Sequence, residues 1–161
     1  MKEITDKTSM VELSAIVSDA LEQAGIIATL SGGAAVTIYS NNAYESADLD
    51  FVTSESNKII KKTIEKLGFR QSAGSRMFEH PETNWYIEFP PGPLGFGDTY
   101  VDQAKLPMLG TKYGPVRVIT PTLCILDRLA AHNGTHLSAM MIVWRARTGG
   151  LNGSCRSRSS V

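Results

Sequence analysis

Two aspartates separated by a single leucine are the residues of this sequence best suited to chemistry. Asp48 and Asp50 lie in an apolar stretch, 47–53, whose side chains alternate as in a β-strand. Residues i and i+2 of a strand share a face about 7 Å apart, so both carboxylates leave the same face. The two carboxylates repel each other unless a cation or water lies between them. Mg²⁺ favours a few carboxylate oxygens together with substrate phosphates. The pair is either a metal site or an acidic strand edge, and its spacing leaves both interpretations open.

Further groups suited to phosphate chemistry lie on both sides of this pair. Glu88 occupies another apolar stretch and joins the same face if that stretch pairs with 47–53. A third acid there can accept a proton from an attacking hydroxyl or hold a second metal ion. Ser31, Gly32 and Gly33 end one strand and open a helix, where backbone N–H groups can approach a phosphate closely and the serine hydroxyl can donate to it.

The hydrophobic pattern predicts the elements that position these residues. Helices are expected at 10–24, at 34–40, after a capping Ser54, and from Pro121 onward with Thr120 as the cap. Strands are expected at 26–30, 47–53, 76–80 and 84–89, and more weakly at 100–106 and 115–119. This order predicts an α+β fold, with a mixed sheet and helices mainly on one of its faces.

Composition narrows the class of protein. The 161 residues suit one domain, and a formal net charge of zero argues against a broadly basic surface for duplex nucleic acid. The polar N-terminus lacks a signal core, and no run reaches the roughly 18 apolar residues of a membrane span. We therefore expect a cytoplasmic protein that does not contact the membrane. Of the two cysteines, Cys124 is predicted to be a buried thiol.

The order of these motifs resembles a known superfamily. With Gly32-Gly33, then Asp48-Leu49-Asp50, then Glu88, the chain resembles the DNA-polymerase-beta-like nucleotidyltransferases in their minimal one-domain form, over about residues 26–90. The motifs EFPPGPL (88–94), ITPT (119–122) and DRLAA (127–131) are similar to a bacterial subgroup of nucleotidyltransferase-like proteins. That subgroup is itself similar to the nucleotidyltransferases of abortive-infection and toxin–antitoxin systems. The resemblance then extends to a domain over 1–132.

The resemblance implies a reaction and assigns roles to the motif residues. A nucleoside monophosphate would pass from an NTP to an acceptor hydroxyl on an RNA, a protein or a small molecule, with release of pyrophosphate. Catalysis would require Mg²⁺. The implied catalytic and metal-binding residues are Asp48, Asp50 and Glu88, and the implied triphosphate-binding residues are Ser31, Gly32 and Gly33.

The sequence lacks an obvious phosphate-binding cation near these motifs. No Lys or Arg lies between Gly33 and Asp48, so the cation must come from elsewhere in the chain. The candidates are Arg70, Arg76 and Lys112. Asp127 and Arg128 are expected to pair within the final helix or to brace the sheet, without a catalytic part.

The end of the chain differs from the rest and leaves activity open. The stretch 133–161 is basic: no acidic residue follows Asp127, and the last part, 148–161, has no apolar period. It is predicted to be either a disordered basic tail or the product of a frame shift. Two alternatives to an enzyme follow: a non-catalytic nucleotidyltransferase-like module that binds a protein, as in a toxin–antitoxin pair, or an inactive truncated remnant. A homodimer would cover the apolar surface that such a truncation exposes.

Overall fold

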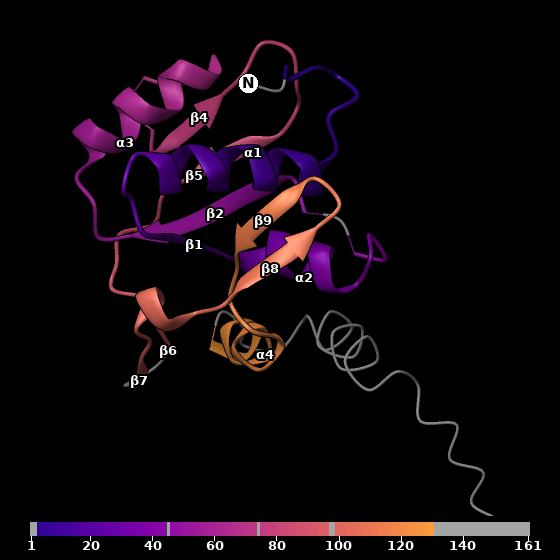
Figure 1. The fold of residues 1–161 in the computed structure, drawn as a ribbon, viewed down its shortest axis with the longest axis vertical. Helices are drawn as coiled ribbons and strands as arrows, with labels where there is room; N and C mark the ends of the chain where they lie inside the picture. The colour runs from indigo at the N-terminus through magenta and orange to yellow at the C-terminus, as the bar shows by residue number, and fades with distance from the viewer. Residues whose placement is uncertain (1–2, 45, 74, 97–98, 131–161) are drawn as a thin grey trace, which may run out of the picture.

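The computed structural model describes residues 3–44, 46–73, 75–96 and 99–130 (Figure 1). Its helices are α1 (Met10–Gln23), α2 (Gly32–Tyr39), α3 (Asn57–Ile64) and α4 (Pro121–Ala130), with 3₁₀ turns η1 (Glu65–Leu67) and η2 (Gln103–Lys105). Its strands are β1 (Ala28–Ser31), β2 (Asp48–Thr53), β3 (Arg70–Gln71), β4 (Met77–Glu79), β5 (Tyr86–Glu88), β6 (Gly95–Phe96), β7 (Thr99–Tyr100), β8 (Met108–Thr111) and β9 (Gly114–Arg117). The predicted tail, 133–161, lies outside the described residues, as do residues 131–132 of the predicted domain.

The main sheet has five strands in the order β1-β2-β5-β4-β3. β2 is antiparallel to β1 and parallel to β5, while β4 is antiparallel to both of its neighbours, β5 and β3. The chain returns to the β1 edge after β9, where Val118 bridges Leu30 and the Ile119 N–H donates to the Leu30 carbonyl at 3.0 Å. The sheet is therefore mixed, as predicted from the sequence.

The two faces of the sheet differ in chemistry. Because directly paired residues share a face, Leu30, Phe51, Leu49 and Ile87 lie together on one side, and all four are fully buried. This apolar face lies beneath α1 and α3, whose buried residues belong to the same core. The opposite face carries the polar side chains of β1, β2 and β5. The α+β fold with helices mainly on one face is thus confirmed.

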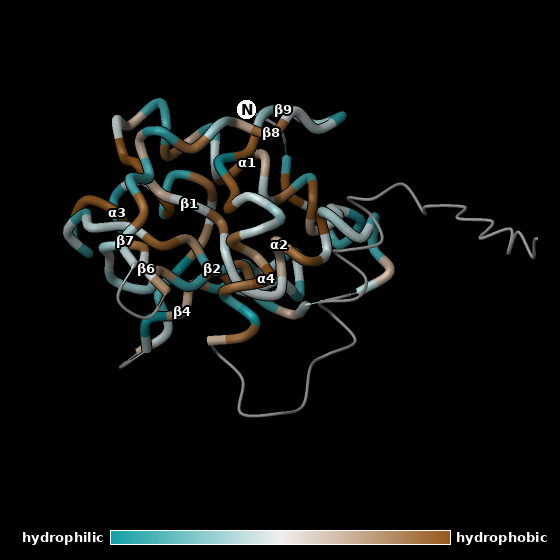
Figure 2. The backbone as a smooth tube through the Cα atoms, turned by 90° about the horizontal axis from the view of Figure 1, so that it is seen from below, coloured by the Kyte–Doolittle hydropathy of each residue, from teal (hydrophilic) through white to brown (hydrophobic). Residues whose placement is uncertain are grey.

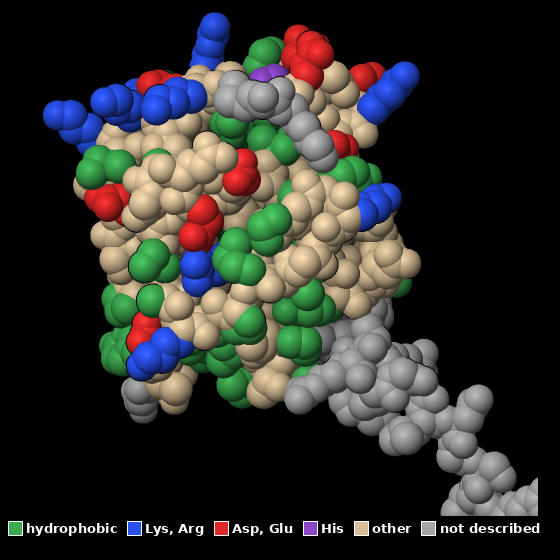
Figure 3. Space-filling view, in the orientation of Figure 1, with side chains coloured by type: hydrophobic (Ala, Val, Ile, Leu, Met, Phe, Trp, Pro, Cys, Tyr) green, Lys and Arg blue, Asp and Glu red, His purple; other side chains and the backbone are tan. Residues whose placement is uncertain are grey.

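Hydrophobic patterning explains the helices that cover the apolar face. α1 begins at Met10 after the N-cap residue Ser9, whose Oγ accepts from the Glu12 N–H at 3.3 Å, and the Ser9–Glu12 spacing is that of a capping box. Hydrophobic segments run through the middle of the molecule around β1, α2 and α4 (Figure 2). Lysines gather instead on the outer side of α3 (Figure 3); the exposed ones are Lys58, Lys61, Lys62 and Lys66. In the described part of the chain, no helix is both long and apolar enough to span a membrane.

Some predicted elements differ from the structure. The stretch 100–106 contains the end of β7 and the 3₁₀ turn η2, which Asp102 caps by accepting from the Ala104 N–H; the expected strand there is wrong because the local cap outweighs a weak apolar pattern. α3 begins after Ser56 rather than after Ser54. β8 was not predicted, although it forms a hairpin with β9 in which Leu109 pairs with Val116.

A polar cap fixes the start of α4. The Leu123 N–H donates to Thr120 Oγ1 at 3.3 Å, which satisfies a helix N–H that otherwise has no partner within the helix. We expect Thr120→Ala to lower the free energy of unfolding by about 1 kcal/mol in urea denaturation. Ser56→Ala is the matched control, because the Ser56 side chain makes no capping bond, and its effect should stay within about 0.5 kcal/mol. Equal effects from the two variants would contradict this account.

Candidate functional site

The sheet register brings the predicted acids onto one face. Asp50 pairs with Glu88 across the parallel β2–β5 ladder and with Ser31 across the β1–β2 ladder. Ser31, Asp50 and Glu88 therefore stand side by side on three adjacent strands. Asp48 lies on the same face of β2, two residues before Asp50. The grouping expected from the sequence requires β5 beside β2, and the structure places it there.

Gly32 allows the backbone to pass directly over Asp50. Its φ is +64°, and a Cβ at this position would lie 2.3 Å from Asp50 Oδ2. Both the left-handed backbone and the missing side chain are thus required, because no larger residue fits without moving the carboxylate. The carboxylate of Asp50 and the first residue of α2 are in direct contact. The glycine turn and the acids belong to one site.

Gly33 has a different neighbour, which the sequence did not single out. A Cβ there would lie 2.5 Å from Ser46 Oγ, and the same hydroxyl donates to Asp48 Oδ1 at 2.7 Å. Ser46 thus links the start of α2 to the first aspartate and fixes the orientation of its carboxylate. The Ser31 hydroxyl lies 3.5 Å from the Asp50 carbonyl oxygen, and Ser31 does not cap α2 through its side chain.

Asp50 is the electrostatic centre of the site. Burial, followed by the charges of Asp48, Glu88 and Asp127, raises its pKa to about 6, whereas the charge of Arg128 acts in the opposite direction. A carboxyl group whose ionised form is disfavoured by burial and by like charges favours a nearby cation. Clustered carboxylates of this kind occur at functional sites.

The helix α4 and the proline-rich segment 90–96 border the site next to Asp50. A cavity of about 300 Å³ lies between them, and Gly32, Asp50, Leu94, Phe96, Asp127 and Arg128 are among the residues that line it. Arg128 donates from Nη2 and Nε to the same oxygen, Asp127 Oδ2, at 2.6 and 2.9 Å. The expected pairing of Asp127 with Arg128 within the final helix is confirmed. That the pair lines the same cavity as Asp50 could not be predicted from the sequence.

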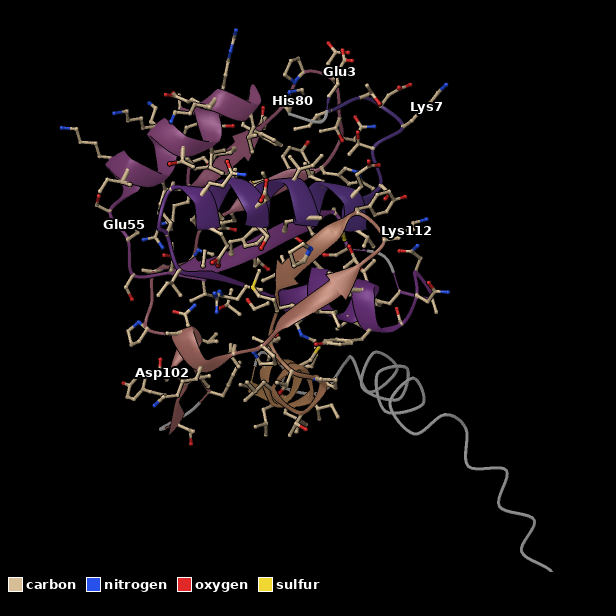
Figure 4. All side chains as sticks on the ribbon, in the orientation of Figure 1. Glu3, Lys7, Glu55, His80, Asp102 and Lys112 are labelled. Atoms are coloured by element: carbon tan, nitrogen blue, oxygen red, sulfur yellow. The ribbon has the colours of Figure 1, made fainter. Side chains whose placement is uncertain are left out.

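The three cations proposed from the sequence do not line this cavity. Arg70 lies on β3, at the far edge of the sheet, and Arg76 is exposed immediately before β4. Lys112 lies in the turn between β8 and β9 (Figure 4), with Nζ 4.7 Å from the centre of the Tyr113 ring. Arg128 is the cationic side chain that the described part of the chain contributes to the cavity lining.

The donor set suits a hard cation only in part. Within the described residues, no group of three or more His, Cys, Asp or Glu side chains is arranged to hold a metal ion jointly. Asp48, Asp50 and Glu88 share a face, and Asp50 interacts electrostatically with both other acids. Mg²⁺ commonly takes one or two carboxylates and completes its shell with water and substrate phosphates. The arrangement therefore fits Mg²⁺ that is bound together with a phosphorylated substrate.

Comparison with known proteins identifies the fold. Neither protein-family profiles nor curated sequences give a significant match. Among solved structures, the antibiotic-resistance factor ANT(2'')-Ia superposes in its solution structure with a TM-score of 0.55 and 16% identity, over 90% of this chain and 85% of that one. Its crystal structure with adenylyl-2''-tobramycin gives a TM-score of 0.57 and 13% identity, over 86% and 88% of the two chains. The lincomycin-bound lincosamide antibiotic adenylyltransferase LnuA gives a TM-score of 0.59 and 15% identity, over 91% and 99%.

These similarities are similarities of fold. The chain has the nucleotidyltransferase fold, as its motif order predicted, and shares it with an antibiotic-resistance factor and with a lincosamide antibiotic adenylyltransferase.

Proposed function

We propose that the protein is a nucleotidyltransferase that moves a nucleoside monophosphate from an NTP to an acceptor hydroxyl. The observation that carries this proposal is the alignment of Asp48, Asp50 and Glu88 on one face, with Gly32 against the Asp50 carboxylate. Phosphoryl transfer requires mainly positioning and neutralisation of charge. The carboxylates can hold cations that neutralise charge. The glycines at the start of α2 leave backbone N–H groups free to position the phosphate oxygens.

Each residue has a role in this proposal. Asp48 and Asp50 would hold Mg²⁺, which would neutralise phosphate charge when bound. Ser46 keeps the Asp48 carboxylate oriented through its 2.7 Å hydrogen bond. Glu88, the acid on the neighbouring strand, would accept the proton of the acceptor hydroxyl or contribute to cation binding. Ser31, Gly32 and Gly33 would bind the triphosphate.

The acceptor in this proposal is a small molecule. The cavity beside Asp50 is about 300 Å³ and has an apolar wall that includes Leu94 and Phe96, within the size range of small-molecule sites. The structural neighbours support this choice, since their structures contain adenylyl-2''-tobramycin and lincomycin. The narrower relationship to abortive-infection and toxin–antitoxin proteins, the cytoplasmic location and the homodimer stay predictions from the sequence.

The decisive experiment follows nucleotide and acceptor together. The protein is incubated with α-labelled NTPs, Mg²⁺ and either tobramycin or lincomycin, and both labelled product and released pyrophosphate are measured. We expect Asp48→Ala to abolish transfer and to weaken nucleotide binding, because one of the two aspartates proposed to hold the cation is lost. Asp6→Ala, at an exposed position before α1, is the control and should behave as wild type. If wild type binds no nucleotide in the presence of Mg²⁺, the proposal is wrong, and a non-catalytic binding module becomes the better description.

A further inference from the structure

The ion pair at the end of α4 is unusual in its geometry. Asp127 and Arg128 are adjacent in sequence, and neighbouring residues on a helix normally point apart. Here the Arg128 guanidinium folds back so that two of its nitrogens donate to one oxygen, Asp127 Oδ2. Both side chains are largely buried, with exposed fractions of 19% for Arg128 and 20% for Asp127. The pair is therefore mostly shielded from solvent, at the wall of the cavity.

The surroundings of the pair are strongly anionic. Asp127, Arg128 and Asp50 line the same cavity, and Asp48 and Glu88 act on Asp50 from the neighbouring positions of the sheet. The guanidinium thus shares the cavity lining with two carboxylates, Asp50 and Asp127. Its hydrogen bonds nevertheless go to the carboxylate beside it in sequence, while Asp50 receives only its longer-range charge.

We propose that Asp127 is an internal substitute for a phosphate: it holds the Arg128 guanidinium in the cavity and releases it to the triphosphate of the bound nucleotide. This inference rests on the proposed function, because it requires the triphosphate of an NTP beside Gly32, Asp50 and Arg128, which line one cavity. A phosphate offers a guanidinium two parallel hydrogen bonds in a planar fork, whereas the Asp127 carboxylate engages both nitrogens through a single oxygen. When the phosphate replaces Asp127 as the partner of Arg128, no second cationic side chain is required near Gly32.

The pair has a cost and a benefit for nucleotide affinity. Asp127 competes with the phosphates for Arg128 and adds a negative charge that repels them. It also keeps the guanidinium ordered and neutralised while the cavity contains no anion, since an unpaired buried charge is unfavourable. Removal of the carboxylate charge should therefore strengthen nucleotide binding, whereas removal of the guanidinium should weaken it.

Calorimetric titration with a non-hydrolysable ATP analogue and Mg²⁺ tests this proposal. We expect Asp127→Asn to tighten binding about threefold to tenfold, in proportion to a partly buried ion pair. Arg128→Gln should weaken binding about tenfold to a hundredfold, because charge-assisted bonds to phosphate are lost. The affinity of Arg128→Lys should lie between those of wild type and Arg128→Gln. In the Arg128→Gln background Asp127→Asn should tighten binding less than it does in wild type, because it then removes only the repulsion by its charge and no competition for a guanidinium.

Controls separate this role from a structural one. Glu22→Gln removes the acid of another arginine ion pair, Glu22–Arg117, on α1 and β9, and should leave nucleotide affinity unchanged. Arg128→Gln should also reduce the preference for the ATP analogue over AMP, which a general loss of packing would not change. Weaker binding by Asp127→Asn, or unchanged binding by Arg128→Gln, overturns the inference while the proposed function stands. If wild type binds no nucleotide, both are overturned.

Discussion

Asp50→Asn is expected to reduce nucleotidyl transfer by about a thousandfold, the scale at which a charged group that stabilises a transition state contributes to catalysis. Asp50 lies between Ser31 and Glu88 in the sheet, touches the start of α2 and lines the cavity. Asparagine keeps the shape of the side chain but removes the charge that would hold the cation. Initial rates at saturating NTP and Mg²⁺ measure the effect. Asp102→Asn, at an exposed position, should leave the rate unchanged.

The same substitution should stabilise the fold at neutral pH. The pKa of Asp50 is raised from 3.8 to about 6, chiefly by burial and then by Asp48 and Glu88, so the folded state binds this proton more tightly than the unfolded state. The carboxylate therefore destabilises the fold as pH rises from about 4 to 6. After allowance for solvent contact, Asp50→Asn should add about 1 kcal/mol to the free energy of unfolding at pH 7 and almost nothing at pH 4. Urea denaturation at the two pH values measures this difference.

If Asp50→Asn instead lowered the free energy of unfolding at pH 7, the ionised Asp50 carboxylate would be stabilised by its interactions in the folded state, and the prediction would be wrong. Mg²⁺ offers a second readout on the same proteins. A cation that binds only the folded state raises the melting temperature, so Mg²⁺ with an NTP analogue should stabilise wild type and leave Asp50→Asn unaffected. If the melting temperatures of wild type and Asp50→Asn rose equally, the cation would bind at a site that does not include Asp50.

Gly32→Ala is expected to impair both stability and activity. The new Cβ would lie 2.3 Å from Asp50 Oδ2 at a φ of +64°, which combines backbone strain with a direct steric conflict. We expect a loss of about 3 kcal/mol in the free energy of unfolding. Transfer should fall by about a hundredfold, because relief of the conflict displaces the Asp50 carboxylate, and small displacements of this kind are costly to catalysis. Urea denaturation and steady-state kinetics measure the two effects.

Gly25 provides a closely matched control for this variant. Its φ of +72° is nearly the same, but a Cβ there would have no neighbour within 4 Å. Gly25→Ala should therefore cost only the backbone strain, about 1 kcal/mol, and leave the rate intact. When Asp50→Ala is combined with Gly32→Ala, the steric conflict is removed. The alanine at position 32 should then cost about as much unfolding free energy as the alanine at position 25. If Gly32→Ala and Gly25→Ala are equally destabilising, contact with Asp50 is not the reason for glycine at position 32.

The acids could be predicted from the sequence because strand geometry is local. Alternation places Asp48 and Asp50 on one face without knowledge of the rest of the chain. The position of Glu88 required one further condition, the adjacency of β5 and β2, which the motif order supplied and the register satisfies. The glycine turn was also readable, although the contact of Gly32 with Asp50 depends on the path of the backbone.

The rest of the site depends on tertiary packing. Arg128 follows Asp50 by 78 residues in the sequence, and a helix pattern does not specify which side chain faces a distant strand. The β8–β9 hairpin was missed because its turn, Lys112-Tyr113, lacks the usual Asn-Gly signal, although Gly114 supplies a φ of +141°. Ser46 lies in a polar connection whose role follows only from its bond to Asp48.

The return of the chain to the β1 edge has a consequence for the order of events during synthesis. Val118 and Ile119 attach beside Leu30, and Tyr39 donates its hydroxyl proton to the Ile119 carbonyl at 2.9 Å, so α4 docks on parts of the chain made much earlier. Since translation proceeds from the N-terminus, the acids can assemble on the ribosome before Arg128 has left the exit tunnel. A nascent chain arrested before α4 should therefore bind Mg²⁺ and nucleotide together more weakly than the full chain does, because it lacks Arg128.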